Sequence, residues 1–205
     1  MKKLLITRGL PQDVLDAARA RFDVTLREST EGLMPDEAAH ALAEFDAILP
    51  TLGDQFTADA FGGQVRAGVL GNFGVGYNHI DVAAATKAGV LVSNTPDVVT
   101  DATADIAMTL ILSACRRAGE GERLLRSGMW LGWSPVQMLG THVTGKRVGI
   151  VGMGRIGQAV ARRCHYGFDM PVIYFNRSQK EVDVPARQVE TLAALMSQAD
   201  IIVVT

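Results

Sequence analysis

Residues 146–157 read KRVGIVGMGRIG, and this stretch decides the fold. An apolar strand leads into it, an amphipathic helix follows, and glycines stand at Gly152, Gly154 and Gly157. The first glycine of such a G-x-G-x-x-G spacing permits a tight turn, and the second lets the backbone approach a pyrophosphate. The third lets the helix pack close to the strand. The stretch therefore predicts the dinucleotide-binding turn of a doubly wound α/β domain.

The start of this helix is the expected phosphate site. A helix N-terminus carries a partial positive charge, and its first amides have no partner inside the helix. The amides of Arg155 and Ile156 would therefore point at the phosphates. The alternative is a flexible strand–helix turn with no ligand.

The residues after the next strand bear on the choice of cofactor. An NAD site usually places Asp or Glu there to hold the ribose 2′-hydroxyl. This chain has Asn176, Arg177 and Ser178 instead, and Asn176 lies 19 residues after Gly157. An arginine and a hydroxyl without a carboxylate suit the 2′-phosphate of NADP. We expect NADP (NADPH) as the preferred cofactor and NAD as the second choice; an ordinary polar strand end is the alternative without function.

Strands alternate with helices on both sides of the glycine stretch. We expect strands at residues 147–151, 172–175 and 201–205, and helices at 155–166 and 189–198. These three strands make one βαβαβ half of a Rossmann domain, and dinucleotide binding normally uses two halves. No helix follows the last strand, so we expect the chain to be cut in mid-domain.

The first hundred residues show the same alternation, which predicts a second parallel sheet and an α/β fold. Strands are expected at residues 4–7, 24–26, 47–50, 67–70 and 91–93, and helices at 11–21, 35–43, 58–61 and 80–88. One long helix over 101–127, buried in its first part, and a Gly-, Trp- and Pro-rich arm over 128–145 follow. We divide the chain into a first domain (1–98), the helix with its arm (99–145) and an incomplete dinucleotide-binding domain (146–205).

Composition excludes several classes of protein. The 205 residues are 48% hydrophobic with a formal net charge of −2, which argues against disorder and against nucleic acid or membrane as partners. No apolar stretch is long enough to cross a bilayer, and MKKLLITRG is not a signal peptide. Cys115 and Cys164 are expected to be reduced thiols, which excludes a zinc site built from cysteines. We therefore expect a soluble, cytoplasmic protein without a metal.

Two further motifs point to a known family. GNFGVGYNHID spans residues 71–81, and NTPDVVTDATAD spans residues 94–105. Together with the glycine stretch, they make the chain resemble the D-isomer-specific 2-hydroxyacid dehydrogenases over its whole length. The branch that it resembles most is glyoxylate/hydroxypyruvate reductase, because TPDVVTDATAD, CRR and GMWLGWSP recur there. The resemblance implies a flavodoxin-like substrate domain followed by the first half of a Rossmann domain.

The resemblance also implies roles for particular residues. The amides of Val75 and Gly76 would hold the carboxylate of a small 2-keto acid, and the turn at Leu52 and Gly53 would line the same pocket. Thr103 would contact the cofactor from the long helix. The other cofactor-binding positions would be Gly152, Gly154, Arg155, Ile156, Gly157, Asn176, Arg177 and Ser178. The implied reaction is the NADPH-dependent reduction of glyoxylate or hydroxypyruvate to the D-2-hydroxy acid.

The chain departs from the family at the catalytic residues. The family uses an Arg, a Glu and a His that lie beyond the point where this sequence ends, and no residue here matches them by motif. His79, inside GYNHID, is expected to have a structural role. We therefore expect these 205 residues to be inactive alone. The alternatives are a D-2-hydroxyacid dehydrogenase for D-lactate, D-glycerate, phosphoglycerate or formate, and a non-catalytic nucleotide-sensing module.

The arm over residues 128–145 indicates that the chain binds another protein surface. Trp130 and Trp133 stand in a loop, and amphipathic aromatic residues on exposed loops are typical of interfaces. The resemblance implies that the arm packs on a second subunit, so we expect a homodimer formed through the long helix and the arm. The alternative is a lid over the glycine-rich domain of the same chain.

Overall fold

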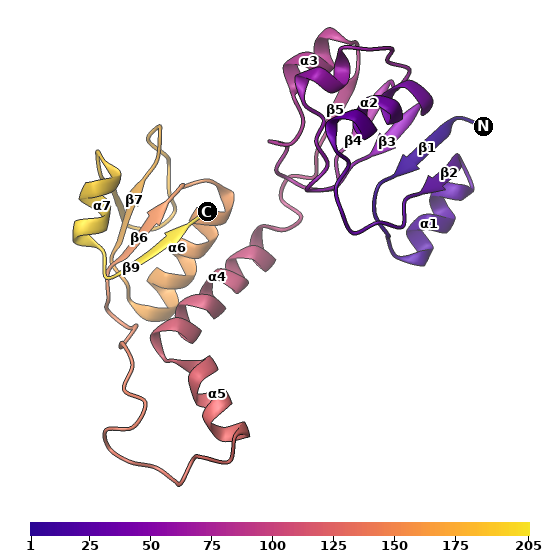
Figure 1. Cartoon of the computed structure of the whole chain (residues 1–205). Coiled ribbons are helices and arrows are strands. Elements are labelled where there is room, and N and C mark those ends of the chain that lie inside the picture. The colour runs from indigo at the N-terminus through magenta and orange to yellow at the C-terminus, as the bar shows by residue number, and fades with distance from the viewer. The chain divides into compact units, whose positions relative to one another are not determined.

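The computed structural model describes all 205 residues and divides into two compact units, Met1–Asp97 and Val98–Thr205. Each unit holds a parallel sheet covered by helices (Figure 1). The predicted α/β class is therefore confirmed. None of the helices is both long and apolar enough to span a lipid bilayer.

The sheet of the first unit has five parallel strands in the order β2-β1-β3-β4-β5. The strands are β1 (Lys3–Ile6), β2 (Asp23–Leu26), β3 (Ala47–Leu49), β4 (Val69–Gly71) and β5 (Leu91–Ser93). This is the flavodoxin-like order, as the resemblance implied. Because the strands are parallel, the loops after β1, β3 and β4 leave the sheet at one edge.

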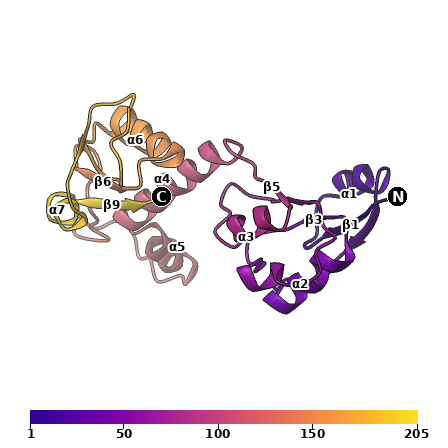
Figure 2. The ribbon, with the colours of Figure 1, turned by 90° about the horizontal axis from the view of Figure 1, so that it is seen from above.

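Helices cover both faces of this sheet, and Figure 2 shows α1 and α2 on opposite sides of it. Leu15 of α1 (Gln12–Arg19) packs with Leu4 and Ile6, which share one face of β1. Leu5 and Ile48 point to the other face. There they meet the helices α2 (Pro35–Glu44) and α3 (Val82–Lys87) and the 3-10 helix η1 (Ala58–Phe61). The alternation of burial along β1 is what a strand between two layers of helices requires.

The sheet of the second unit has four strands, not the three predicted. The strands are β6 (Val148–Val151), β7 (Val172–Phe175), β8 (Ala186–Gln188) and β9 (Ile201–Val204), in the order β8-β7-β6-β9. The missed strand β8 reads ARQ, and this short polar edge strand gives no apolar run to find. The helix expected from residue 189 begins only at Leu192, where Thr191 Oγ1 accepts the amide of Ala194 at 3.0 Å.

The glycine turn follows β6, and the strand order of the sheet reverses next to this strand. The chain crosses from β8 at one edge to β9 on the far side of β6, so the strand order reverses beside β6. Ligands of open α/β sheets bind outside the carboxyl ends of the strands at such a switch point. Here α6 (Arg155–Phe168) covers one face and α7 (Leu192–Gln198) covers the other.

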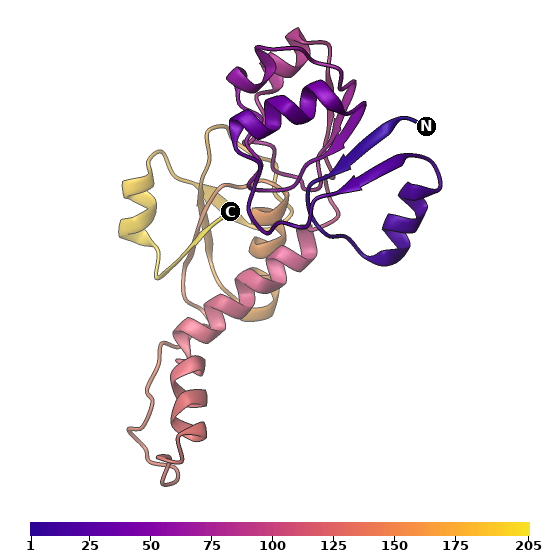
Figure 3. The same cartoon turned by 45° about the vertical axis from the view of Figure 1, so that its right-hand side comes forward.

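The prediction of a single long helix over residues 101–127 is wrong. Two helices, α4 (Thr100–Cys115) and α5 (Ala118–Arg126), meet at Arg117, whose left-handed φ of +53° breaks the helix. At this break the carbonyl of Cys115 accepts the amide of Thr141 at 2.7 Å, which ties the returning arm to the helix (Figure 3).

The prediction that the first part of this helix is buried holds on one side only. Met108 of α4 contacts Cys164 of α6, with 3.6 Å between the two sulfur atoms. In contrast, Ile106 and Leu110 are 60% and 63% exposed. Both cysteines are unpaired, and burial raises the pKa of the Cys164 thiol to about 11.

Candidate functional site

The turn after β6 cannot hold side chains at two of its glycines. Gly152 has a φ of +94°, and a Cβ on it would lie 2.3 Å from the carbonyl oxygen of Thr205. A Cβ on Gly157 would lie 2.1 Å from the carbonyl oxygen of Gly152. A larger residue at either position would push the turn away from the end of β9 or from α6.

Gly154 is different, because a Cβ there would meet no atom within 4 Å. Gly154 is the N-cap residue of α6, which has no side-chain cap and no acidic residue in its first turn. The helix end therefore keeps both its positive field and space for an anion. A pyrophosphate fits such a place, with the first-turn residues Arg155 and Ile156 beside it.

Asn176, at the end of β7, ties the glycine turn to the next loop. Its Oδ1 accepts the amide of Met153 at 3.2 Å, and its Nδ2 donates to the carbonyl oxygen of Ser178 at 2.8 Å. Asn176 is half-buried, whereas Arg177 and Ser178 are exposed. The Asn176 amide thus has a supporting role that the sequence did not indicate, and a guanidinium and a hydroxyl remain at the surface beside it.

The first unit holds a buried carboxyl group at the carboxyl edge of its sheet. Asp54 is fully buried, and its Oδ2 accepts from Thr7 Oγ1 at 2.6 Å and from the amide of Thr51 at 2.8 Å. Its Oδ1 accepts from the amide of Leu33 at 2.9 Å. The side chain of Asp54 therefore joins the ends of β1 and β3 to the segment before α2. No local pattern in the sequence singles out Asp54, because its partners Thr7 and Leu33 are distant in the sequence.

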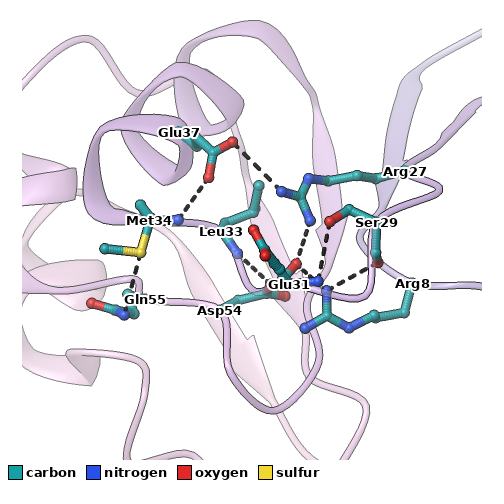
Figure 4. A network of polar contacts seen from close by, with 9 residues as sticks. All are labelled: Arg8, Arg27, Ser29, Glu31, Leu33, Met34, Glu37, Asp54 and Gln55. Atoms are coloured by element: carbon teal, nitrogen blue, oxygen red, sulfur yellow. Dashed lines mark hydrogen bonds and ion pairs between the residues drawn. The ribbon is translucent and has the colours of Figure 1, made fainter.

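Arg8 supports the same turn from the end of β1. Its guanidinium donates to the carbonyl oxygens of Ser29, at 3.3 Å, and Glu31, and Figure 4 shows both contacts. Gly53 has a φ of +101°, and a Cβ on it would lie 3.5 Å from Arg8 Nη2. Arg8 thus holds the 29–31 loop against the Leu52–Gly53 turn.

A second loop lies beside this turn. The amide of Phe73 donates to the carbonyl of Pro50 at 2.9 Å, and a Cβ on Gly74 would lie 3.9 Å from Leu52 Cγ. The amides of Val75 and Gly76, which follow directly, donate to no group in the chain. The structure therefore brings the four expected substrate positions to one edge of the sheet, where the amides of Val75 and Gly76 have no partner in the chain.

His79 lies at the end of the loop that follows β4. Its ring is partly buried, and this burial lowers its pKa, while the nearby charge of Asp54 acts in the opposite direction. Its backbone carbonyl accepts the amide of Phe56 at 2.9 Å.

The cofactor positions all lie in the unit Val98–Thr205, and the substrate positions all lie in Met1–Asp97. Thr103 is exposed near the start of α4, and its amide donates to the carbonyl of Val99 at 2.9 Å. A glycine turn at the switch point of a parallel sheet and an uncapped helix behind it define a dinucleotide-binding α/β protein.

Comparison with known proteins gives the family. Residues 108–205 match the profile of the D-isomer specific 2-hydroxyacid dehydrogenase, NAD binding domain. A glyoxylate reductase from Thermococcus gammatolerans is 37% identical over 98% of this chain and 62% of its own length. A glycerate dehydrogenase from Hyphomicrobium methylovorum is 36% identical over 96% of this chain and 62% of its own length. The crystal structure of the TT0316 protein from Thermus thermophilus superposes with a TM-score of 0.87, at 35% identity, over 99% of this chain and 64% of that one.

The chain belongs to the D-isomer-specific 2-hydroxyacid dehydrogenase family. It spans less than two thirds of the length of these relatives.

Proposed function

We propose that this chain supplies the substrate- and cofactor-binding parts of an NADPH-dependent reductase. The enzyme would reduce glyoxylate or hydroxypyruvate to the D-2-hydroxy acid. The observation that carries the proposal is that the backbone N–H groups of Val75 and Gly76, beside the Leu52–Gly53 turn, have no hydrogen-bond acceptor in the chain. Two adjacent N–H donors at an exposed loop suit the carboxylate of a small 2-keto acid. The names of the glyoxylate reductase and glycerate dehydrogenase relatives support the same substrates.

The chain's own residues would bind and orient the reactants. Val75 and Gly76 would fix the carboxylate, and the Leu52–Gly53 turn would limit the size of the group beside it. The first turn of α6 would hold the pyrophosphate at Gly154. When bound, the reduced cofactor supplies a hydride to the carbonyl carbon of the keto acid. No residue in 1–205 matches the catalytic Arg, Glu and His of the family, so we expect these residues to bind both ligands without turnover.

The test is oxidation of NADPH by a protein of full family length that carries these 205 residues. We expect faster oxidation with glyoxylate or hydroxypyruvate than with pyruvate or a phosphorylated keto acid, and no reduction of NADP by formate, which a formate dehydrogenase would oxidise to CO₂. Faster turnover of one of these others would favour another dehydrogenase of the family. Tight NADPH binding with no turnover of any keto acid would favour the nucleotide-sensing module.

The preference for NADPH rests on Arg177 and Ser178, which are exposed after β7 where a carboxylate would repel a 2′-phosphate. One charge-assisted hydrogen bond from Arg177 corresponds to a preference of about 10- to 150-fold. We expect Arg177→Ala to weaken NADPH binding by about that factor and to leave NADH binding nearly unchanged. Fluorescence titration with both cofactors measures this, with the exposed Arg187→Ala as the matched control. Equal weakening of both cofactors would exclude Arg177 as the phosphate ligand.

The homodimer is a proposal that the surface of α4 supports. Ala102, Ile106, Leu110 and Ala114 follow one another at every fourth residue and are all exposed, so they form one apolar stripe. Trp130 and Trp133 of the arm are also exposed, by 48% and 81%. Stripe and arm together offer the apolar surface that a second copy of this chain would cover. A cytoplasmic location stays a prediction from composition.

A further inference from the structure

Two asparagine side chains hold three consecutive carbonyl oxygens in the loop after β4. Asn72 Nδ2 donates to the carbonyl oxygens of Gly74, at 3.0 Å, and Gly76, at 2.9 Å. Asn94 Nδ2 donates to the carbonyl oxygen of Val75, which lies between them, at 2.9 Å. A side chain therefore holds each of these peptide groups, and the carbonyl oxygen of Gly74 also accepts the amide of Thr95 at 3.1 Å.

Fixing a carbonyl also fixes an amide. In a trans peptide the C=O and the following N–H point in opposite directions. The N–H groups of Val75, Gly76 and Tyr77 consequently point away from the asparagine that holds each peptide group. Where successive backbone N–H groups converge, they form a concavity that binds anions. The asparagines thus explain why the amides of Val75 and Gly76 have no partner within the chain.

The orientation of Asn72 is fixed in turn. Asn72 is 2% exposed, and because its Nδ2 serves two carbonyls, its Oδ1 faces His79 Nε2 at 3.0 Å. An amide oxygen only accepts, so His79 carries its proton on Nε2. The histidine thereby keeps the amide of Asn72 from turning over.

We propose that Asn72 and Asn94 are positioning residues that hold the amides of Val75 and Gly76 ready for the substrate carboxylate. The inference rests on the proposed function, which supplies the identity of the anion. It adds that the anion site is built before the ligand arrives, so little free energy of binding is lost in ordering the loop.

The test is a titration of the ¹⁵N-labelled chain with oxalate, a small unreactive dicarboxylate, in which the amide signals of Val75 and Gly76 are followed. Asn72→Asp cannot donate and repels the two carbonyls, so we expect oxalate binding to weaken about 10- to 100-fold. Asn94→Asp releases only the Val75 carbonyl. The Gly76 amide should then lose its response to oxalate while the Val75 amide keeps most of its own, and a general loss of folding would not produce this difference.

Asn78→Asp is the control, because it adds the same charge to the same loop at an exposed residue. It should bind oxalate as the wild type does. If Asn72 proves too buried to replace without unfolding, the Asn94 variant still decides. Wild-type signals that respond while the Asn72 and Asn94 variants bind like Asn78→Asp would overturn this inference and leave the proposed function standing. Wild-type signals that do not respond at all would overturn the carboxylate assignment in the proposed function, and the inference with it.

Discussion

The glycines of the turn after β6 have different roles. Gly157 is needed for packing, whereas we expect Gly154 to be needed for binding the cofactor. Gly157 has no room for a Cβ, so Gly157→Ala should lower the free energy of unfolding by about 1–3 kcal/mol. Gly154 has open space and an ordinary φ of −79°, so Gly154→Ala should leave folding nearly unchanged. The same methyl group would stand where the backbone must approach a pyrophosphate, and we expect NADPH binding to weaken at least about tenfold. Urea denaturation and NADPH fluorescence check the pair; unchanged NADPH binding by Gly154→Ala would contradict the site.

His79 gives the first unit a dependence on pH. Burial lowers its pKa below the ordinary value of 6.5. The unfolded chain therefore takes up the proton first as the pH falls, and the free energy of unfolding decreases as the pH drops below 6.5. His79→Gln keeps a donor for Asn72 but does not titrate. Urea denaturation at pH values on both sides of that pKa should show a larger loss of stability for the wild type, and equal losses would contradict the assignment.

At the scale of elements, the buried carboxyl of Asp54 joins β1, β3 and the segment before α2. Asp54→Asn replaces one acceptor oxygen by an NH₂ group and leaves a buried donor without a partner. We expect the free energy of unfolding to fall by about 3 kcal/mol. Asp59→Asn, in η1, makes the same chemical change at an exposed position and should stay within about 0.5 kcal/mol of the wild type. Equal stability of the two variants, measured by urea denaturation, would mean that Asp54 is not structural.

The helices and strands also differ in how well the sequence predicted them. Apolar runs such as VGIV and VIYF, and the spacing of Gly152, Gly154 and Gly157, predicted most strands and the glycine turn, because these signals are local. The edge strand ARQ and the helix break at Arg117 depend on pairing with β7 and on the returning arm, so no local pattern reveals them. The contact between Thr7 and Asp54 joins positions 47 residues apart, and only the folded sheet brings them together. The sequence therefore indicated the loops that we propose to bind ligands but not the side chains that hold these loops in place.

For the whole molecule, the apolar stripe on α4 predicts the assembly. Leu110→Asp places a charge in the middle of the stripe, where burial of an unpaired carboxylate is costly. We expect sedimentation equilibrium to show a dimer for the wild type and a monomer for this variant. Val14→Asp is the control, because Val14 is an exposed apolar residue on α1 of the other unit, 44% accessible. A wild type that is monomeric, or a Leu110 variant that dimerises normally, would contradict the proposed interface.

We infer that the second unit binds a nicotinamide dinucleotide at the turn between β6 and α6. Titration of the ¹⁵N-labelled chain with NADPH tests it most directly, because each amide reports its own position. We expect saturable binding with the largest shifts at residues 152–157 and 176–178, and smaller shifts for the same concentration of NADH. Saturable binding with shifts elsewhere, or no binding at either stretch, would contradict it.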